Sequence, residues 1–322
     1  MSLLASVARA PTGYRVAIMT DAPGWHTRVL QRALRERGCS GRCLDLADCR
    51  VDTTQSRHGL VLPGFGERLP DAVLVRGIAA GSFEQVTLRL GVLHALRELG
   101  VPVYNDARAI ERSVDKSMTT LLLHAAGIAT PPTWAMQSPA LAQRLVTRES
   151  AAARSLVLKP LFGSQGKGLR RVGWVDGAHV ALPSLAAPYG HLAYLQRFIA
   201  PLSAPGHDWR VLVVGGRAVA AMRRVSAHWV HNVAQGARCV PQSLADATGH
   251  ALAALAQGAA RALDLDYAGV DLLPSRDGTQ VIEVNGIAAW QGLQRTTSFD
   301  IAGAIVSDLL DRRLAARARR HA

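Results

Sequence analysis

The sequence predicts an α/β protein with a parallel α/β lobe at the N-terminus and lobes of the α+β type after it. Up to about residue 105, short apolar segments alternate with helix-length segments, which is typical of strands joined by crossover helices. Beyond about residue 150, apolar strands follow one another through glycine-containing turns, which is typical of antiparallel hairpins. The 322 residues are enough for two or three lobes, each with its own core.

Glycines end both helices predicted in the N-terminal lobe. Gly38 and Gly100 follow the last helical residues, where glycine readily adopts the left-handed conformation that stops a helix. The predicted elements of this lobe are strand Arg15–Thr20, helix His26–Arg37, strand Arg42–Leu46, strand Asp71–Gly77, helix Ser82–Leu99 and the extended segment Val101–Asn105.

Proline and glycine also delimit the elements of the later lobes. Pro131 and Pro132 close a helix because proline cannot continue one, and Gly215 and Gly216 mark a hairpin turn. The predicted elements are helix Ala107–Gly127, strands Ser155–Lys159, Arg170–Val175 and Ala193–Ile199, hairpin Arg210–Val214 with Arg217–Met222, helix Leu244–Leu263, hairpin Gly269–Leu273 with Thr279–Asn285, and a last helix from about Phe299. We therefore expect a disordered leader (1–12), an N-terminal α/β domain (13–106), a central lid subdomain (107–192) and a C-terminal subdomain (193–322).

The composition is that of a globular enzyme, with 49% hydrophobic and 19% charged residues. No uninterrupted apolar run is long enough to cross a bilayer, and the first 12 residues lack the apolar core of a signal peptide. A cytoplasmic location is therefore expected. Cys39, Cys43, Cys49 and Cys239 lack the paired spacing that predicts a disulfide scaffold or a zinc site.

The net charge of +13 permits an acidic partner such as a nucleic acid, the ribosome or an acidic small molecule. Part of this charge is a basic C-terminal segment, where cations complement the end of a helix. Its arginines are Arg312, Arg313, Arg317, Arg319 and Arg320. We favour this helix-end explanation over nucleic-acid binding.

Lysine is rare in this chain, since Lys116, Lys159 and Lys167 are the only lysines among 37 basic residues. An arginine-rich composition favours arginine wherever the two are interchangeable, so a lysine indicates a position that needs a compact ammonium, such as a phosphate site. Lys159 lies just before the glycine-rich segment Gly163–Gly168 and Lys167 lies within it, and the backbone N–H groups of this segment can approach a polyphosphate closely. The alternative is three surface lysines.

The last predicted hairpin carries a set of oxygen ligands. Glu283 and Asn285 are two residues apart and therefore lie on one face of their strand, and Asp271 on the partner strand can reach that face. Carboxylate and amide oxygens suit Mg²⁺ bound to nucleotide phosphates. The alternative is a half-exposed strand with ordinary outward polar positions.

Several further segments recur in the same order in a known family. They are Asp71–Arg76, Arg112–Lys116, Lys159–Gly168, Gln196–Ile199, Asp208–Gly215, Asn232–Gly236, Ala268–Asp271 and Glu283–Asn285. In this order they resemble the ATP-grasp superfamily and, more narrowly, the RimK-type amino-acid ligases. The resemblance extends from about Asp71 to Leu310. It implies an ATP-grasp fold, in which an N-terminal parallel α/β domain precedes two α+β lobes that clamp ATP.

The resemblance also implies roles for the matching residues. Lys159, Arg210 and Asn285 are the expected catalytic residues, and Asp271, Glu283 and Asn285 are the expected ligands of Mg²⁺, or of Mn²⁺ in its place. The backbone of Gln196–Ile199 is expected to pair with adenine. The full set of expected ATP-binding residues is Lys116, Lys159, Gly163, Ser164, Gln165, Gly166, Lys167, Gly168, Gln196, Arg197, Phe198, Ile199, Asp208, Arg210 and Asn232.

Two segments depart from the family pattern. Arg197 stands where related ligases often have glutamate, and Asn285–Gln294 lacks the usual Asn-x-x-Pro-Gly motif. The second departure points to a different acceptor pocket, closer to that of ligases acting on pterin or furan coenzymes. The residues expected to bind substrate are Arg76, Arg223, Arg224 and Trp290, with Trp209 and Trp229 as further stacking candidates. Surface charge is the alternative for Arg223 and Arg224, and a core position is the alternative for the tryptophans.

The function implied by the resemblance is an ATP-dependent carboxylate–amine ligase that works through an acyl phosphate. It would add L-glutamate to a carboxyl group of a tetrahydromethanopterin- or methanofuran-like coenzyme. Alternatives are glutamylation of a ribosomal protein C-terminus or of an amino-group carrier protein and, from another class, a non-catalytic ATP- or RNA-binding protein. We expect small-molecule substrates, no membrane or nucleic-acid partner, and a homodimer or homotetramer.

Overall fold

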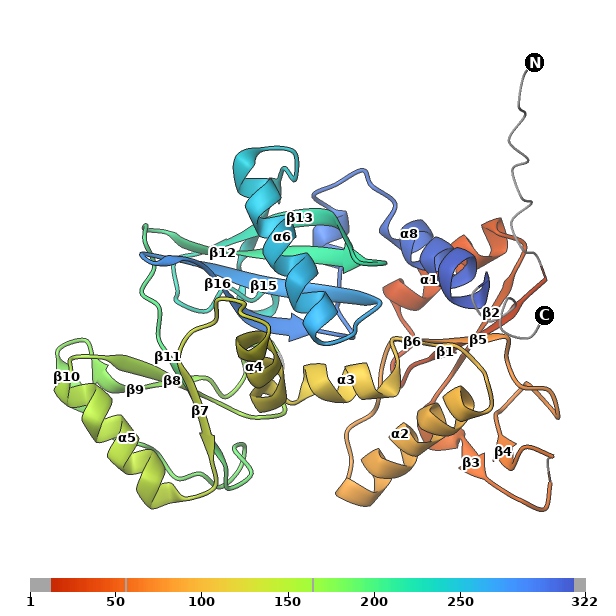
Figure 1. Cartoon of the computed structure of the whole chain (residues 1–322), viewed down its shortest axis with the longest axis horizontal. Helices are drawn as coiled ribbons and strands as arrows, with labels where there is room; N and C mark the ends of the chain where they lie inside the picture. The colour runs from red at the N-terminus through yellow and green to blue at the C-terminus, as the bar shows by residue number, and fades with distance from the viewer. Residues whose placement is uncertain (1–12, 56, 164, 316–322) are drawn as a thin grey trace. The chain divides into compact units, whose positions relative to one another are not determined.

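The computed structural model describes residues 13–55, 57–163 and 165–315, and it contains two compact units (Figure 1). The first unit combines the chain up to Arg108 with the segment from Asp300, and the second runs from Ala109 to Phe299. The expected leader (1–12), Ser164 and the tail arginines Arg317, Arg319 and Arg320 lie outside the described residues. Among the described helices, none combines the length and apolar character needed to span a membrane.

The first unit is built on a parallel sheet of order β2-β1-β5-β6. Its strands are β1 (Arg15–Met19), β2 (Ser40–Leu44), β5 (Ala72–Val75) and β6 (Val103–Tyr104). The central strands β1 and β5 are buried almost throughout, as expected for a parallel sheet covered on both faces. The predicted parallel α/β architecture of this lobe is therefore confirmed.

Helices α1 (Trp25–Glu36) and α2 (Phe83–Glu98) connect these strands, and a small hairpin pairs β3 (Arg50–Val51) with β4 (Leu60–Val61). The C-terminal helix α8 (Ile301–Ser307) and the helical turns Asp308–Leu314 also belong to this unit, and α8 packs against α1. Arg37 donates hydrogen bonds to Ser307 and Asp311, both at 2.6 Å, and so ties the end of α1 to this segment. The expected C-terminal subdomain (193–322) includes the segment from Asp300, but this segment groups with the first unit because of contacts with α1 that chain order does not reveal.

The second unit contains two antiparallel sheets, and the first has the order β10-β9-β8-β11-β7. Its strands are β7 (Thr133–Met136), β8 (Ser155–Lys159), β9 (Arg170–Val175), β10 (Ala178–Val180) and β11 (Ala193–Arg197). Apolar side chains of β8 and β11 form a core with Leu145 and Val146 of helix α5 (Pro139–Ala151). Strands β8 and β9 form the predicted hairpin around the glycine-rich segment.

The predicted helix Ala107–Gly127 is two helices, α3 (Ala107–Val114) and α4 (Lys116–Ala125). The break occurs at Asp115, whose carboxylate accepts hydrogen bonds from the backbone N–H groups of Ser117 at 2.8 Å and Met118 at 3.1 Å. This is the geometry of a helix N-cap. As a result, Lys116 becomes the first residue of α4 rather than a mid-helix residue.

The second sheet of this unit has the order β14-β13-β12-β15-β16. Its strands are β12 (Gly206–Val214), β13 (Arg217–Ser226), β14 (Arg238–Gln242), β15 (Tyr267–Ser275) and β16 (Gly278–Asn285), and the short helix α7 (Gln291–Gln294) follows them. Trp209, Val211 and Val213 of β12 share a core with helix α6 (Ala247–Ala262). Side chains alternate along a strand, so Asp208 and Arg210 lie on the opposite face of the sheet from α6.

Candidate active site

A cavity in the second unit collects most of the predicted ATP-binding residues. The glycine-rich segment, the end of β11 and the α6-distal face of the second sheet all contribute to its wall. The predicted residues that line it are Lys116, Lys159, Gly163, Gln165, Gly166, Lys167, Gln196, Arg197, Phe198, Ile199, Asp208, Arg224, Asn232, Asp271 and Glu283. The predicted site residues of this unit that do not line the cavity are Gly168, Arg210, Arg223, Asn285 and Trp290. Arg76 belongs to the first unit, and Ser164 lies outside the described residues.

The two predicted phosphate lysines enter this cavity from different elements. Lys116 donates hydrogen bonds to the carbonyl oxygens of Leu161 at 3.2 Å and Gly163 at 2.8 Å, so it contacts the glycine-rich segment directly. Lys159, at the end of β8, donates to the side-chain oxygen of Gln196 at 2.6 Å. Burial lowers the pKa of both ammonium groups, to about 8 for Lys159, where the nearby charge of Lys116 lowers it further.

The glycine-rich segment needs glycine at position 166. Gly166 has φ +71°, and a Cβ there would lie 2.8 Å from Asn232 Oδ1 and 2.8 Å from Val230. The segment therefore packs closely against the loop that carries Val230 and Asn232. Gln235, from the same loop, donates a hydrogen bond to the carbonyl of Gln165 at 3.2 Å.

The predicted adenine segment Gln196–Ile199 forms another wall of the cavity. It contains Arg197, the residue that stands where related ligases often have glutamate. Arg197 donates to the buried carboxylate of Glu149 on α5 at 2.9 Å, and its guanidinium lies 5.8 Å from the Trp134 ring centroid. The Arg197 side chain thus lies on the α5 face of the sheet. An arginine at this position therefore places its cation against α5, and the segment Gln196–Ile199 still lines the cavity.

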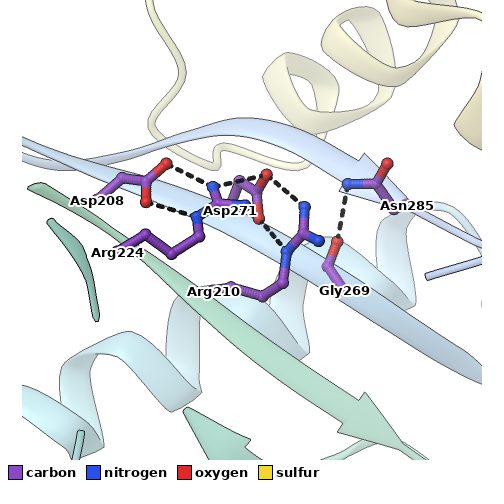
Figure 2. A network of polar contacts seen from close by, with 6 residues as sticks. All are labelled: Asp208, Arg210, Arg224, Gly269, Asp271 and Asn285. Carbon is purple, nitrogen blue, oxygen red and sulfur yellow. Dashed lines mark hydrogen bonds and ion pairs between the residues drawn. The ribbon is translucent and has the colours of Figure 1, made fainter. Parts of the chain in front are cut away.

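The strand register brings the predicted magnesium ligands together. Asp271 on β15 lies directly opposite Glu283 on β16, and Gly269 lies opposite Asn285. Directly opposed residues of an antiparallel pair share a face of the sheet. The Asn285 amide donates to the Gly269 carbonyl at 3.4 Å, as Figure 2 shows.

Asp271 is held by two arginines. Arg210 donates to both oxygens of Asp271 at 2.7 Å, and Arg224 lies 2.9 Å from Asp271 and also binds Asp208 at 2.7 and 2.5 Å (Figure 2). Burial alone would raise the pKa of Asp271, but the guanidinium groups outweigh it and hold this pKa below its usual value. Burial raises the pKa of Asp208 to about 6, against the opposing effect of Arg224.

The assignment of Asp271, Glu283 and Asn285 as magnesium ligands stays a prediction. No group of three or more His, Cys, Asp or Glu side chains suited to a metal ion occurs in the part of the chain that the structure describes. Asp271 shares its oxygens with Arg210 and Arg224, whereas the Glu283 side chain makes no hydrogen bond or ion pair with any described residue. A hard divalent cation fits the donor chemistry of Glu283, Asp271 and the Asn285 amide oxygen.

The structure also changes the expectations for substrate contacts. Arg224 is 2% exposed, so it is not a surface charge, and both of its carboxylate partners are within the protein. Arg210 commits its Nε–Nη2 edge to Asp271, so this edge does not hold a substrate carboxylate here. Trp290 is 1% exposed, which does not fit the expectation that it stacks on an acceptor, and Trp209 belongs to the α6 core. Trp229 does line the cavity, in edge contact with Phe198.

Sequence reasoning missed His231, which lines the same cavity and is 6% exposed. Burial lowers its pKa to about 4, with a further contribution from Arg224, so the imidazole is neutral near pH 7. The signal available in the sequence was its position next to Asn232. The histidines form no metal-ligand pattern along the chain that would have singled it out.

Comparison with known proteins agrees with this arrangement. Residues 113–309 match the RimK-like ATP-grasp domain, and residues 14–110 match the RimK PreATP-grasp domain. The tetrahydromethanopterin:alpha-L-glutamate ligase of Methanosarcina acetivorans is 32% identical over 314 residues, covering 85% of this chain and 92% of that protein. A probable alpha-L-glutamate ligase of Teredinibacter turnerae is 32% identical over 297 residues, covering 91% and 94%.

Solved structures show the same fold. The ATP-grasp ligase PsnB, complexed with a minimal precursor, Mg and ADP, matches with a TM-score of 0.63 at 21% identity, over 95% of this chain and 98% of that chain. The predicted ATP-grasp fold is thereby confirmed, with its parallel sheet in the first unit and antiparallel sheets in the second. On the strength of the two matched domains, which together span most of its length, this chain belongs to the RimK-like ATP-grasp family of ligases.

Proposed function

We propose that this protein is an ATP-dependent ligase that adds L-glutamate to a carboxyl group of a small coenzyme-like acceptor, with release of ADP and phosphate. The observation that carries the proposal is the convergence of Lys116, Lys159 and Glu283 on one cavity, which the segment expected to bind adenine, Gln196–Ile199, also lines. The named relatives are glutamate ligases, and those from methanogens act on tetrahydromethanopterin.

The reaction needs an activated carboxylate, because a carboxylate does not react directly with an amine. Transfer of the γ-phosphoryl group of ATP to the acceptor carboxylate gives an acyl phosphate, and the glutamate amine then displaces phosphate to form the amide. Glu283, Asp271 and Asn285 would hold Mg²⁺, which would neutralise charge on the phosphates. Lys116 and Lys159 supply two further cations at this end of the cavity.

Arg210 and Arg224 belong to a buried charge network beside the cavity. Asp208 and Asp271 offset the charges of Arg210 and Arg224, so the buried network as a whole is close to neutral. The uncompensated charges facing the cavity are therefore those of the lysines and of Glu283. This distribution suits a magnesium–polyphosphate ligand, because cations meet the phosphate oxygens and a carboxylate meets the metal.

The test is ADP release by the full-length protein with ATP, Mg²⁺, L-glutamate and candidate acceptors, with products identified by mass spectrometry. A tetrahydropterin carboxylate, a furan-type coenzyme and a peptide with a free C-terminus provide three acceptor arms. We expect ADP release to require both glutamate and a coenzyme acceptor, and the product to gain glutamyl units.

The matched variants are Glu283→Ala and, as a control, Glu98→Ala at the exposed end of α2. Glu283→Ala should remain folded and lose nearly all ADP release, while Glu98→Ala should keep it. A folded Glu283→Ala protein with near-normal turnover would contradict the role of Glu283 in the proposed reaction. ATP binding without turnover by any acceptor arm, together with salt-sensitive RNA binding, would instead favour the non-catalytic alternative.

A further inference from the structure

The buried side chain of Gln196 connects Lys159 to a chain of hydrogen bonds across three strands. Gln196 is 3% exposed and lies on β11, next to β8 on one side and β7 on the other. Its Oε1 accepts from Lys159 Nζ at 2.6 Å, and its Nε2 donates to Thr133 Oγ1 at 3.1 Å. The Thr133 hydroxyl in turn donates to the carbonyl of Pro131 at 2.7 Å.

The strand register explains why these groups meet. Gln196 lies directly opposite Thr133 on β7 and Val157 on β8, and Lys159 lies opposite Tyr194, two residues before Gln196. Cross-strand partners share a face, so Gln196, Thr133 and Lys159 all lie on the same face of this sheet. The α5 face holds the apolar side chains Leu156, Leu158 and Leu195 instead.

The two ends of the chain fix its direction. The Pro131 carbonyl can only accept a hydrogen bond, so the Thr133 hydroxyl donates its proton there and offers its oxygen to Gln196. An ammonium can only donate, so Lys159 requires the oxygen of the Gln196 amide. One orientation of the Gln196 amide satisfies both contacts, with its NH₂ group toward Thr133 and its oxygen toward Lys159. The Pro131 carbonyl, which orients the Thr133 hydroxyl, thus also orients the oxygen that Lys159 contacts.

The charge of this acceptor is as relevant as its position. The charged groups that act on Lys159 are Lys116 on α4, Asp271 on β15 and Glu283 on β16. A neutral amide oxygen aims the ammonium without neutralising it, whereas a carboxylate in the same place would form an ion pair. A neutral acceptor therefore adds no negative charge of its own beside the ammonium that a polyanionic ligand would meet.

We propose that Gln196 is a positioning residue for Lys159, which it holds toward the phosphate end of the cavity as an unneutralised cation, with Thr133 fixing the orientation of its amide. This inference rests on the proposed function, since it takes the polyphosphate of ATP as the ligand of Lys159. In this proposal the Gln196 side chain acts on the phosphates through Lys159, whereas the Gln196 backbone belongs to the segment expected to bind adenine.

The experiment compares the dissociation constants of ATP, ADP, AMP and adenosine for the full-length protein by calorimetry or competition. The variants are Gln196→Leu, Gln196→Glu and Thr133→Val, and the control is Gln137→Leu at an exposed position just after β7. Gln196→Leu should weaken ATP and ADP by about tenfold or more, while adenosine stays within about twofold. Gln196→Glu should weaken ATP by a similar factor because its carboxylate competes with phosphate, and Thr133→Val should act in the same direction by a smaller factor.

Equal weakening of ATP and adenosine in Gln196→Leu would overturn the inference, because it would indicate a general loss of site structure. Unchanged ATP affinity in both Gln196→Leu and Gln196→Glu would also overturn it. If Gln196→Leu does not fold, Gln196→Met, which keeps the length of the side chain, and Thr133→Val carry the same comparison. A wild-type protein that binds no ATP would remove the proposed function itself, whereas a wild type that binds and turns over ATP alongside unaffected variants would remove this inference alone.

Discussion

Asp271 and Glu283 lie directly opposite each other on neighbouring strands, yet of the two only Asp271 is paired with arginines. Asp271 is 2% exposed and lies on the side of Arg210 and Arg224, whereas Glu283 lies on the edge strand β16 and lines the cavity. Two identical charges on adjacent strands therefore have different surroundings. Asp271 offsets the buried arginines, whereas the Glu283 side chain has no arginine partner among the described residues.

Removing Arg224 should be strongly destabilising. Arg224→Leu leaves the buried carboxylates Asp208 and Asp271 without the cation that they share, which costs about 3–5 kcal/mol in comparable buried pairs. The free energy of unfolding from urea denaturation measures the loss. Arg223→Leu, one residue earlier on β13, is the control and should change stability by about 0.5 kcal/mol or less, since none of the described carboxylates pairs with Arg223. Equal losses in the two variants would contradict the role given to the Arg224 network.

ATP binding should weaken as the pH rises through about 8. The pKa of Lys159 is lowered to about 8, so the free protein loses this cation above that pH, and ATP must then bring a proton with it. Calorimetry in buffers of different ionisation enthalpy should show proton uptake on ATP binding at pH 8.5 and little at pH 6.5. Lys159→Arg stays charged throughout this range and should abolish the uptake. Uptake that persists in Lys159→Arg would assign the titration to another group.

The ion pair between Arg197 and Glu149 should contribute to stability but little to ATP binding. Glu149 is buried and Arg197 lies 2.9 Å from it, so Arg197→Leu should cost about 1–3 kcal/mol of unfolding free energy. The ATP dissociation constant should change by less than about threefold, because the side chain lies on the α5 face. Arg148→Leu removes a mainly exposed partner of the same carboxylate and should cost less than about 1 kcal/mol. A large loss of ATP affinity with stability intact would place the Arg197 side chain in the nucleotide site instead.

Gly166→Ala should impair turnover through local contact rather than through backbone strain alone. The methyl group would lie 2.8 Å from Asn232 Oδ1 in a residue with φ +71°. Gly177→Ala is the matched control, because Gly177 has φ +87° with no heavy atom within 4 Å of the added carbon. Strain of about 1–2 kcal/mol is common to both, so the difference in kcat/KM isolates the contact. We expect Gly166→Ala to lose about tenfold more than Gly177→Ala, and equal losses would contradict this packing.

Much of this arrangement follows from local sequence pattern. The alternation of Glu283 and Asn285 predicted a shared face, and the register of β15 and β16 bears this out. The glycine-rich hairpin and the parallel N-terminal sheet were likewise predictable, because turn residues and the spacing of helices depend on neighbouring residues.

The partners of buried charges were not predictable. The contact of Arg224 with Asp208 and Asp271 depends on which strands lie side by side, and the sequence order of β12, β13 and β15 does not specify this. The same applies to Glu149 and Arg197, which are 48 residues apart, and to the segment from Asp300, whose place beside α1 depends on packing. The break at Asp115 could have been predicted, since aspartate is one of the preferred N-cap residues.

The second sheet places stabilising and functional side chains on alternate residues of the same strands. In β12, Trp209 and Val211 pack toward α6 while Asp208 and Arg210 take part in the charge network on the other face. A deletion of one residue at the start of this strand would exchange the two sets, placing charges in the hydrocarbon interior and apolar groups where ions are required. Deletions of one residue in β12 should therefore be tolerated far less than single substitutions. In a scan of such deletions along this strand, folding and activity should be lost together.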